Sequence, residues 1–188
     1  MKLVVGLGNP GREHAATRHN AGFWWLDALA HANGVTLKSE ARFHGSVAKI
    51  AHAGRECWLL KPSTFMNGSG RAVQAITHFY KIAADEILVV HDELDLPPGV
   101  AKLKKGGGVA GHNGLKDIAA SLGNEFWRLR IGIGHPGDQA QVVHYVRSAP
   151  RLEEAALINA ALNSSLELWP MLLEGNIEGA MHRLHTMQ

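Results

Sequence analysis

His19 and Asp92 are the two residues whose types suit hydrolytic chemistry most directly. A neutral histidine held by a carboxylate can act as a general base on a water molecule. His19 lies in a polar segment that follows the apolar run at residues 3–7, and Asp92 directly follows the apolar run at residues 87–90. These two groups supply a base and its orienting partner if their loops converge.

Asn9 lies in a glycine-rich turn, residues 6–11 (GLGNPG), which matches G-x-G-x-x-G after an expected strand. A dinucleotide site would need an apolar helix at the glycines and an acid about 20 residues later. Residues 12–20 are polar, and His31 and Ala32 occupy the place of the acid. We therefore set aside a nucleotide-dependent oxidoreductase and interpret the turn as a loop that brings the Asn9 amide to the carboxyl end of the first strand, where α/β proteins bind ligands.

Other catalytic classes find little support in the chain. No G-x-S-x-G sequence is present, and the single cysteine, Cys57, lies in an apolar run, which disfavours covalent catalysis. His91, Asp92, Glu93 and Asp95 are potential metal ligands, but neighbours on a strand point to opposite faces and no H-E-x-x-H spacing occurs. We expect no metal and no cofactor, and we place His182 and His185 on the exposed face of the last helix.

Residues 96–116 are basic and rich in glycine, with four lysines, six glycines and no acidic residue. Glycine lets backbone N–H groups approach an anion, and a helix starting at Asn113 would turn its positive end toward the same loop. This pattern favours phosphate binding. The alternative is a solvated hairpin whose lysines protect an edge strand from aggregation.

Apolar runs that alternate with helical patterns predict an α/β fold, with a twisted mixed sheet flanked by helices. The expected strands are residues 3–7, 47–51, 57–60, 87–90, 100–103 and 129–133, with a tight turn at Gly54-Arg55. Helices are expected at residues 22–32, from an N-cap at Ser69, from Asn113 to a stop at Gly123, and from Leu152 onward. Pro170 should break this last helix, and Asn176 should cap its final turns.

Composition agrees with one soluble domain over residues 1–188. The chain is 46% hydrophobic and 19% charged, with a formal net charge of +2, one cysteine and no run long enough to span a membrane. A lone cysteine fits a reducing, cytoplasmic setting. Residues 151–188 hold five Glu and two Arg, so the positive excess lies in the first 150 residues, where we expect a polyanionic partner.

Six strings together closely resemble bacterial-type peptidyl-tRNA hydrolase, in order and over nearly the whole chain. They are residues 6–11 (GLGNPG), 17–22 (TRHNAG), 61–67 (KPSTFMN), 91–95 (HDELD), 106–116 (GGGVAGHNGLK) and 128–136 (RLRIGIGHP). Each string is weak alone, but six in register are specific. The resemblance implies a monomeric, metal-independent esterase that cuts the bond between a peptide's carboxyl end and the 3′ ribose of tRNA.

The resemblance also implies roles for individual residues. His19 matches the catalytic base, Asp92 the carboxylate that orients it, and Asn9 and Asn113 the asparagines that hold water and substrate. The positions implied to bind the peptide or lie beside it are Asn67, Phe65, Met66 and the accessory histidine His112. Those implied to meet the tRNA are Lys102, Lys104 and Arg130.

The chain departs from the family pattern at His14, where the family usually has tyrosine, and a shortened segment at residues 126–128 is a second difference. The first replaces an aromatic wall by a smaller, titratable ring near the substrate's 3′ end. As an alternative we keep a noncatalytic RNA-binding module that uses the same lysines. Residues 96–116 contain no aromatic residue for base stacking, which disfavours that module.

Overall fold

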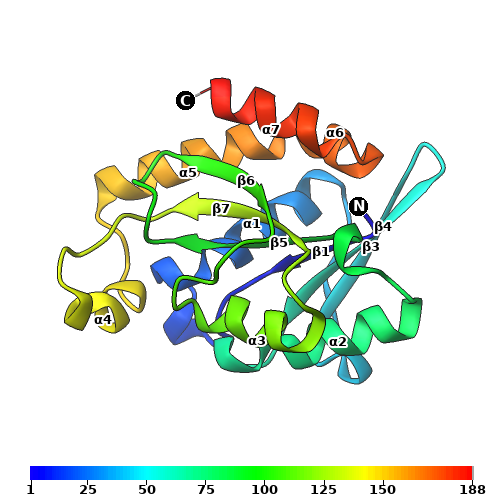
Figure 1. Ribbon diagram of the computed structural model, residues 1–188, viewed down its shortest axis with the longest axis horizontal. Coiled ribbons are helices and arrows are strands. Elements are labelled where there is room, and N and C mark those ends of the chain that lie inside the picture. The colour runs from blue at the N-terminus through cyan, green and yellow to red at the C-terminus, as the bar shows by residue number, and fades with distance from the viewer. Residues whose placement is uncertain (188) are drawn as a thin grey trace.

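The computed structural model describes residues 1–187 and contains one seven-stranded mixed sheet between two layers of helices (Figure 1). The strand order is β2-β3-β4-β1-β5-β7-β6. Strands β1, β4, β5 and β7 are mutually parallel, whereas β3 is antiparallel to β2 and β4, and β6 is antiparallel to β7. The predicted α/β class is therefore confirmed.

The strands are β1 (Leu3–Gly6), β2 (Lys38–Glu40), β3 (Gly45–His52), β4 (Arg55–Pro62), β5 (Ile87–Glu93), β6 (Ala101–Lys105) and β7 (Trp127–Gly132). The helices are α1 (Ala21–Ala32), α2 (Ser69–Tyr80), α3 (Asn113–Leu122), α4 (Val142–Val146), α5 (Leu152–Leu166), α6 (Trp169–Glu174) and α7 (Ile177–Thr186). All six expected strands form, and β2 and α4 are additions that the sequence pattern did not predict.

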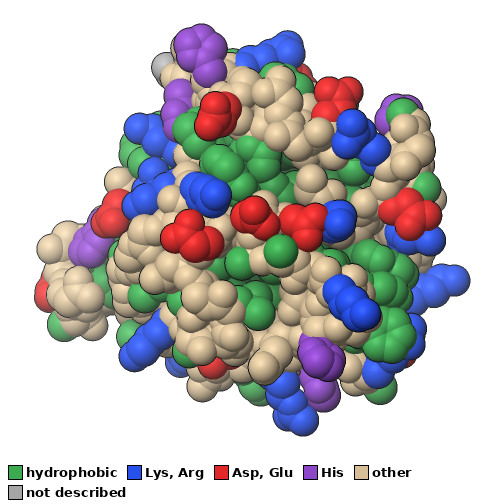
Figure 2. All heavy atoms as spheres, turned by 45° about the vertical axis from the view of Figure 1, so that its right-hand side comes forward, with side chains coloured by type: hydrophobic (Ala, Val, Ile, Leu, Met, Phe, Trp, Pro, Cys, Tyr) green, Lys and Arg blue, Asp and Glu red, His purple; other side chains and the backbone are tan. Residues whose placement is uncertain are grey.

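The core lies on both faces of the sheet. Helices α1, α5, α6 and α7 bury one face, and α2 and α3 bury the other (Figure 1). Strands β1 and β5 are covered on both sides, which explains why they are almost continuously apolar. The face in Figure 2 carries Lys and Arg side chains interspersed with Asp and Glu, so the small positive excess is not gathered there.

Two local predictions were wrong, and a third was right except for its capping residue. The β3–β4 turn is centred on Ala53 and Gly54, both with positive φ, one residue before the expected pair. Ser69 is not the N-cap of α2, since it lies inside the helix and its hydroxyl donates to the Met66 carbonyl. α3 begins at Asn113 and stops at Gly123, as predicted, but its capping side chain belongs to the preceding residue, His112.

The C-terminal predictions were right. α5 ends before Pro170, which lies in the first turn of α6, where its missing N–H costs nothing. The Asn176 side chain accepts from the Gly179 N–H and caps α7. His182 and His185 are exposed, as expected, although His185 Nε2 also accepts from the backbone N–H of Leu103 on edge strand β6. Among residues 1–187, no helix is both long and apolar enough to cross a bilayer.

Candidate active site

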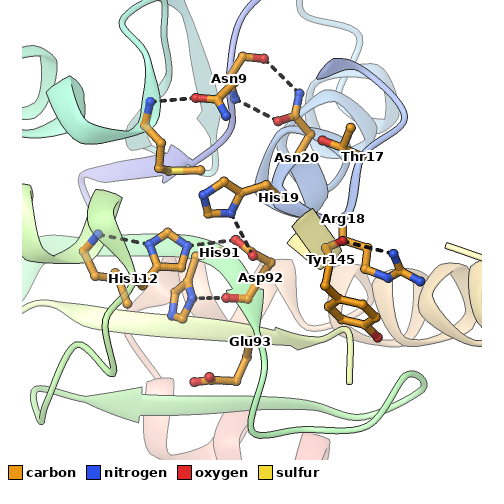
Figure 3. A network of polar contacts seen from close by, with 12 residues as sticks. Asn9, Thr17, Arg18, His19, Asn20, His91, Asp92, Glu93, His112 and Tyr145 are labelled. Atoms are coloured by element: carbon orange, nitrogen blue, oxygen red, sulfur yellow. Dashed lines mark hydrogen bonds and ion pairs between the residues drawn. The ribbon is translucent and has the colours of Figure 1, made fainter. Parts of the chain in front are cut away.

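Asp92 is the centre of the polar network at the carboxyl end of β5 (Figure 3). β1 pairs with β5 only as far as Val90, so β5 extends beyond β1 and is flanked there by β7. The Asp92 side chain is 2% exposed, and each of its carboxylate oxygens accepts a hydrogen bond from one histidine. A buried carboxylate of this kind is stable only because it is fully hydrogen-bonded.

His19 lies in a 3-10 turn, Arg18–Asn20, directly before α1. Its Nδ1 is 2.9 Å from Asp92 Oδ2, so the expected convergence of the two loops is present. A carboxylate only accepts hydrogen bonds, and therefore Nδ1 carries the hydrogen. The Nε2 atom of the neutral ring is then an acceptor, which is the state that a general base needs.

His112 is hydrogen-bonded to the second carboxylate oxygen of Asp92. Its Nδ1 accepts from the Leu115 N–H at 3.3 Å, so its Nε2 carries the hydrogen and donates to Asp92 Oδ1 at 2.8 Å. The two imidazole rings that share Asp92 lie 5.1 Å apart. His112 thus caps α3 and fixes the carboxylate at the same time.

The network separates the proton affinities of its members. Burial raises the pKa of Asp92, but the two adjacent histidines outweigh it and hold that pKa well below its usual range. Burial lowers the pKa of His19, whereas the charge and hydrogen bond of Asp92 raise it, with a net rise. His19, and not Asp92, is therefore the group of this pair that takes up a proton first as the pH falls.

His91 stabilises the network through contacts with the Asp92 backbone and the His112 ring. Its Nδ1 donates to the Asp92 carbonyl at 2.7 Å, and its ring lies against His112. Burial, aided by the neighbouring His112, lowers the pKa of His91 to about 3. Its Nε2 is buried and has no hydrogen-bond partner among the described residues.

Asn9 is held rigidly in the loop after β1. Its Oδ1 accepts from the Met66 N–H at 2.7 Å, and its backbone exchanges two hydrogen bonds with the Asn20 side chain. The Asn9 side chain faces the His19 ring in Figure 3. Because the oxygen is already bound, the amide nitrogen is the group left to donate toward the site.

A cavity of about 420 Å³ lies beside this network. His19, Asp92, His112 and Asn113 line it together with basic side chains from β6 and β7, namely Lys104, Arg128 and Arg130. A neutral base, a fixed carboxylate and nearby cations form a site suited to water attack on an ester of a phosphorylated substrate.

Comparisons with known proteins show the family of the chain. Residues 3–188 match the family model described as peptidyl-tRNA hydrolase. The chain is 64% identical to a peptidyl-tRNA hydrolase of Nitrosospira multiformis, with 100% of this chain and 99% of that protein covered. It is 57% identical to one of Nitrosomonas europaea, with 100% and 97% covered.

Solved structures lead to the same conclusion. The crystal structure of peptidyl-tRNA hydrolase from Acinetobacter baumannii superposes with a TM-score of 0.96 at 46% identity, with 98% of this chain and 94% of that chain covered. The chain belongs to the peptidyl-tRNA hydrolase family.

Two residues implied to bind substrate in this family lie at the surface near Asn9. Phe65 is 60% exposed and Asn67 is also exposed, whereas Met66 between them is buried and hydrogen-bonded through its backbone to Asn9. The His14 ring lies edge-on to Phe65 with 6.1 Å between centroids. The ring that replaces the usual family tyrosine therefore still contacts an aromatic wall.

The three basic residues implied to meet tRNA lie at one edge of the hydrolase fold. β6 is the edge strand, as the alternative interpretation of the lysines supposed, and Lys102 and Lys104 lie opposite Arg130 and Arg128 of β7. Directly opposed residues and those two apart share a face, so four cations gather on one face. Within residues 1–187, Arg130 is the only one of these four cations with an acidic salt-bridge partner, Glu93 at 3.6 Å.

Sequence reasoning missed Arg128, although it alternates with Arg130 as a face-sharing residue should. Its side chain is buried and donates to the carbonyls of Gly108 and Gly107 at 2.6 and 3.0 Å. Arg128 therefore fixes the glycine-rich loop that leads to His112.

Arg18 was also missed, and it connects the base to the opposite wall of the cavity. Its guanidinium donates to the Tyr145 carbonyl, to Ser148 and to Glu154, and it lies 3.9 Å from the centre of the Tyr145 ring. Tyr145 belongs to α4, whose Val142, Val143 and Val146 line the cavity. No sequence signal marked Arg18, because its partners lie about 130 positions away.

A metal ion is a poorer fit than hydrogen bonds at this site. Among the described residues, His19, Asp92 and His112 have ligand atoms within 4.8 Å of one another. However, His112 Nδ1 accepts a backbone N–H, so its Nε2 carries the only ring hydrogen and has no lone pair for a metal. The four potential ligands of residues 91–95 do not meet, since Glu93 turns to Arg130 and Asp95 is exposed.

The remaining reactive side chain is remote from this chemistry. Cys57 is buried in β4, and burial raises the pKa of its thiol to about 12. A thiol of that kind stays protonated and is not a nucleophile.

Proposed function

We propose that this chain hydrolyses the ester between a peptide's carboxyl end and the 3′ ribose of tRNA, with His19 as the general base. The observation that carries the proposal is the 2.9 Å contact between His19 Nδ1 and Asp92, which leaves Nε2 free to accept a proton from water. The proton goes to His19, the hydroxide adds to the ester carbonyl, and the ribose oxygen leaves with the proton returned by His19.

The developing oxyanion needs donors in a fixed position. The Asn9 side-chain nitrogen, Nδ2, is suited to this role. Because Asn9 Oδ1 accepts the Met66 N–H, the amide cannot flip, and Nδ2 keeps its direction. Asn113, exposed at the first turn of α3 and lining the same cavity as His19, is suited to hold water or the substrate. Asn67 and Phe65 are exposed close by, where they can meet the peptide main chain.

Lys102, Lys104 and Arg130 are proposed to bind tRNA phosphate. Like charges directly opposite each other on neighbouring strands repel, so a bound phosphate relieves the repulsion. Such contacts read no base, which suits an enzyme acting on all tRNAs. A noncatalytic RNA-binding module is not favoured, because it gives no reason for a base and carboxylate beside the cations.

The experiment compares cleavage of N-acetylaminoacyl-tRNA and free aminoacyl-tRNA, with and without a chelator. The wild type and His78→Ala, which changes an exposed histidine on α2, should cleave the blocked ester in both conditions. His19→Ala should lose about 10²- to 10⁴-fold in kcat while still binding tRNA. An intact blocked ester with tRNA still bound would favour the RNA-binding module, and loss of activity with chelator would contradict metal independence.

We also propose that residues 1–188 act as one unit and as a monomer in the cytoplasm, where peptidyl-tRNA arises. A single sheet runs through the described chain, and His19, Asp92, His112 and Asn113 line one cavity within it, so the proposed site needs no residue from a second copy. Light scattering at micromolar concentration should give a mass near 20.3 kDa. Twice that mass would contradict the monomer.

A further inference from the structure

Arg128 differs from the three other cations that share its face of β6 and β7. Its side chain is buried, whereas Lys102, Lys104 and Arg130 are partly exposed. Within residues 1–187 it also forms no salt bridge with an acid, whereas Arg130 is paired with Glu93. A buried cation without an acid depends on hydrogen bonds to neutral acceptors. A phosphate can bind the exposed cations without reaching this buried guanidinium.

The Arg128 guanidinium is hydrogen-bonded to both segments that flank α3. Before the helix, Nη1 donates to the Gly108 carbonyl at 2.6 Å and Nη2 to the Gly107 carbonyl at 3.0 Å. After the helix, Nη2 donates to Asn124 Oδ1 at 3.4 Å. The guanidinium also lies 4.6 Å from the centre of the Phe126 ring. One rigid, planar group therefore fixes the chain on both sides of α3.

A tight turn joins the anchored carbonyls to His112. Ala110 and Gly111 have φ angles of 48° and 75°, and the His112 N–H donates to the Val109 carbonyl at 2.8 Å. A positive φ at a residue other than glycine is unfavourable and persists only where the surrounding structure holds it. Here Arg128 holds one end of the turn, and the contact between His112 and the catalytic carboxylate holds the other. The turn therefore transmits the position that Arg128 sets.

His112 connects this turn to the catalytic pair. Its Nε2 donates to Asp92 Oδ1 at 2.8 Å, and its Nδ1 accepts from the Leu115 N–H (Figure 3). If the turn moves, Asp92 loses one of its two histidine donors. The carboxylate then interacts more strongly with His19 alone, which raises the pKa of His19 and changes the direction in which its ring is held.

We infer that Arg128 is a positioning residue for the chemical step, acting through His112 on Asp92, and is not one of the cations that bind tRNA. The inference rests on the proposed function and adds to it a division of labour among four cations on one face. Three bind tRNA phosphate, whereas the fourth keeps the loop before α3 in place. Loss of Arg128 should therefore lower kcat and leave KM unchanged.

The test compares Arg128→Lys and Arg128→Met with the wild type on N-acetylaminoacyl-tRNA. Lysine keeps the charge but cannot reproduce the fork that binds two successive carbonyls, and methionine keeps only the bulk. Both variants should lose about 10- to 10²-fold in kcat. KM should stay within about twofold of the wild type, with an unchanged slope of log KM against log salt. The kinetic pKa assigned to His19 should rise in both, which a smaller folded fraction would not cause.

The matched control is Arg71→Met, which removes an arginine from an exposed position of α2 and should change none of these values. Arg128→Lys decides the question if Arg128→Met does not fold. A raised KM with an unchanged kcat would overturn the inference by placing Arg128 among the tRNA-binding cations. A lower melting temperature with wild-type kcat and kinetic pKa would overturn it by showing a structural role alone.

A second readout needs no substrate and therefore separates this inference from the proposed function. In nitrogen NMR spectra of the free protein, neutral His112 should carry its hydrogen on Nε2 in the wild type and on both ring nitrogens in turn in the Arg128 variants. A His112 spectrum that is the same in all proteins would overturn the inference. Altered spectra in the variants, with a wild type that cleaves no peptidyl-tRNA, would contradict the proposed function instead.

Discussion

The catalytic network around Asp92 and the cationic edge, which consists of Lys102, Lys104, Arg128 and Arg130, are both polar, yet they are built in opposite ways. In the network each polar atom of Asp92 has a partner, and the histidines around it are buried or nearly so. At the edge, Lys102 and Lys104 lie partly exposed on a strand, with arginines and not acids opposite them. The first region is fixed before substrate arrives, whereas the second is completed by the substrate's own charge.

The comparison explains which properties should change when each region is altered. A fixed network acts on the chemical step, so its loss lowers kcat. Exposed cations act on encounter and binding, so their loss raises KM and alters the response to salt.

Asp92→Asn should have the largest effect, because it removes the acceptor that sets the tautomers of both His19 and His112. We expect kcat to fall by about 10⁴-fold, as when the carboxylate of a histidine-based hydrolase is replaced by an amide. KM should change by less than about threefold. Kinetics over a range of substrate concentrations measures both. A comparable rise in KM with an unchanged kcat would place Asp92 in substrate binding instead.

His91 should make the network sensitive to acid. Its pKa is about 3 in the folded chain against 6.5 as the ordinary value, so below pH 6.5 the unfolded chain takes up a proton that the folded chain does not. Stability should therefore fall by about 2 kcal/mol from this group between pH 6.5 and pH 5.

His91→Phe keeps a ring but removes the titrating group, so its urea midpoint should fall less over the same pH range than that of the wild type. The comparison of slopes also removes the contribution of His19, whose raised pKa acts in the opposite direction by favouring the folded state in acid. Equal slopes in the two proteins would show that His91 is not the buried neutral group.

Arg18→Lys should lower kcat/KM by about tenfold. Lysine keeps the charge opposite Glu154 but loses the planar set of donors to Tyr145 and Ser148, so the turn that carries His19 loosens from α4. The kinetic pKa assigned to His19 should shift as well, which a loss of stability alone would not cause. Arg12→Lys, at an exposed position six residues away, is the matched control and should change neither value.

Lys102→Gln combined with Lys104→Gln should raise KM about fivefold and leave kcat unchanged. Each lost phosphate contact should flatten the slope of log KM against log salt by ~0.9. The control pair, Lys38→Gln with Arg55→Gln, removes the same charge from exposed positions outside the cationic edge at β6 and β7. An equal rise of KM in the control would show a general effect of net charge.

His14→Tyr should have the smallest effect. The ring at this position contacts Phe65 and is not bonded to Asp92 or His19, so we expect KM to change by about twofold or less and kcat to stay constant. A tenfold change of kcat would place His14 in the chemical step.

Much of the fold followed from local patterns. Strands β1 and β5 are buried runs whose apolar composition needs no further information, and Pro170 and Asn176 marked helix boundaries through their own geometry. β2 was not predicted because Lys38, Ser39 and Glu40 are polar and pair only with β3 at the sheet's edge. α4 was not predicted because it is only five residues long.

The site followed from sequence only in part. His19 and Asp92 could be paired as a chemical possibility, but their contact spans 73 positions and depends on how β1 and β5 align. The role of His112 as cap and donor was hidden by its neighbour Asn113, the more usual capping residue. Arg18 and Arg128 were missed because buried arginines are defined by distant carbonyl partners, which no local pattern contains.

The most direct test of the central claim is an NMR titration of the imidazole nitrogens of His19, compared with the pH dependence of kcat. The account predicts a neutral His19 with its hydrogen on Nδ1, a pKa above 6.5, and a kcat that rises with pH through that same value. In Asp92→Asn the pKa should fall. A His19 with its hydrogen on Nε2, or a kinetic pKa that does not follow the pKa of His19 in the variant, would contradict the claim that this histidine is the base.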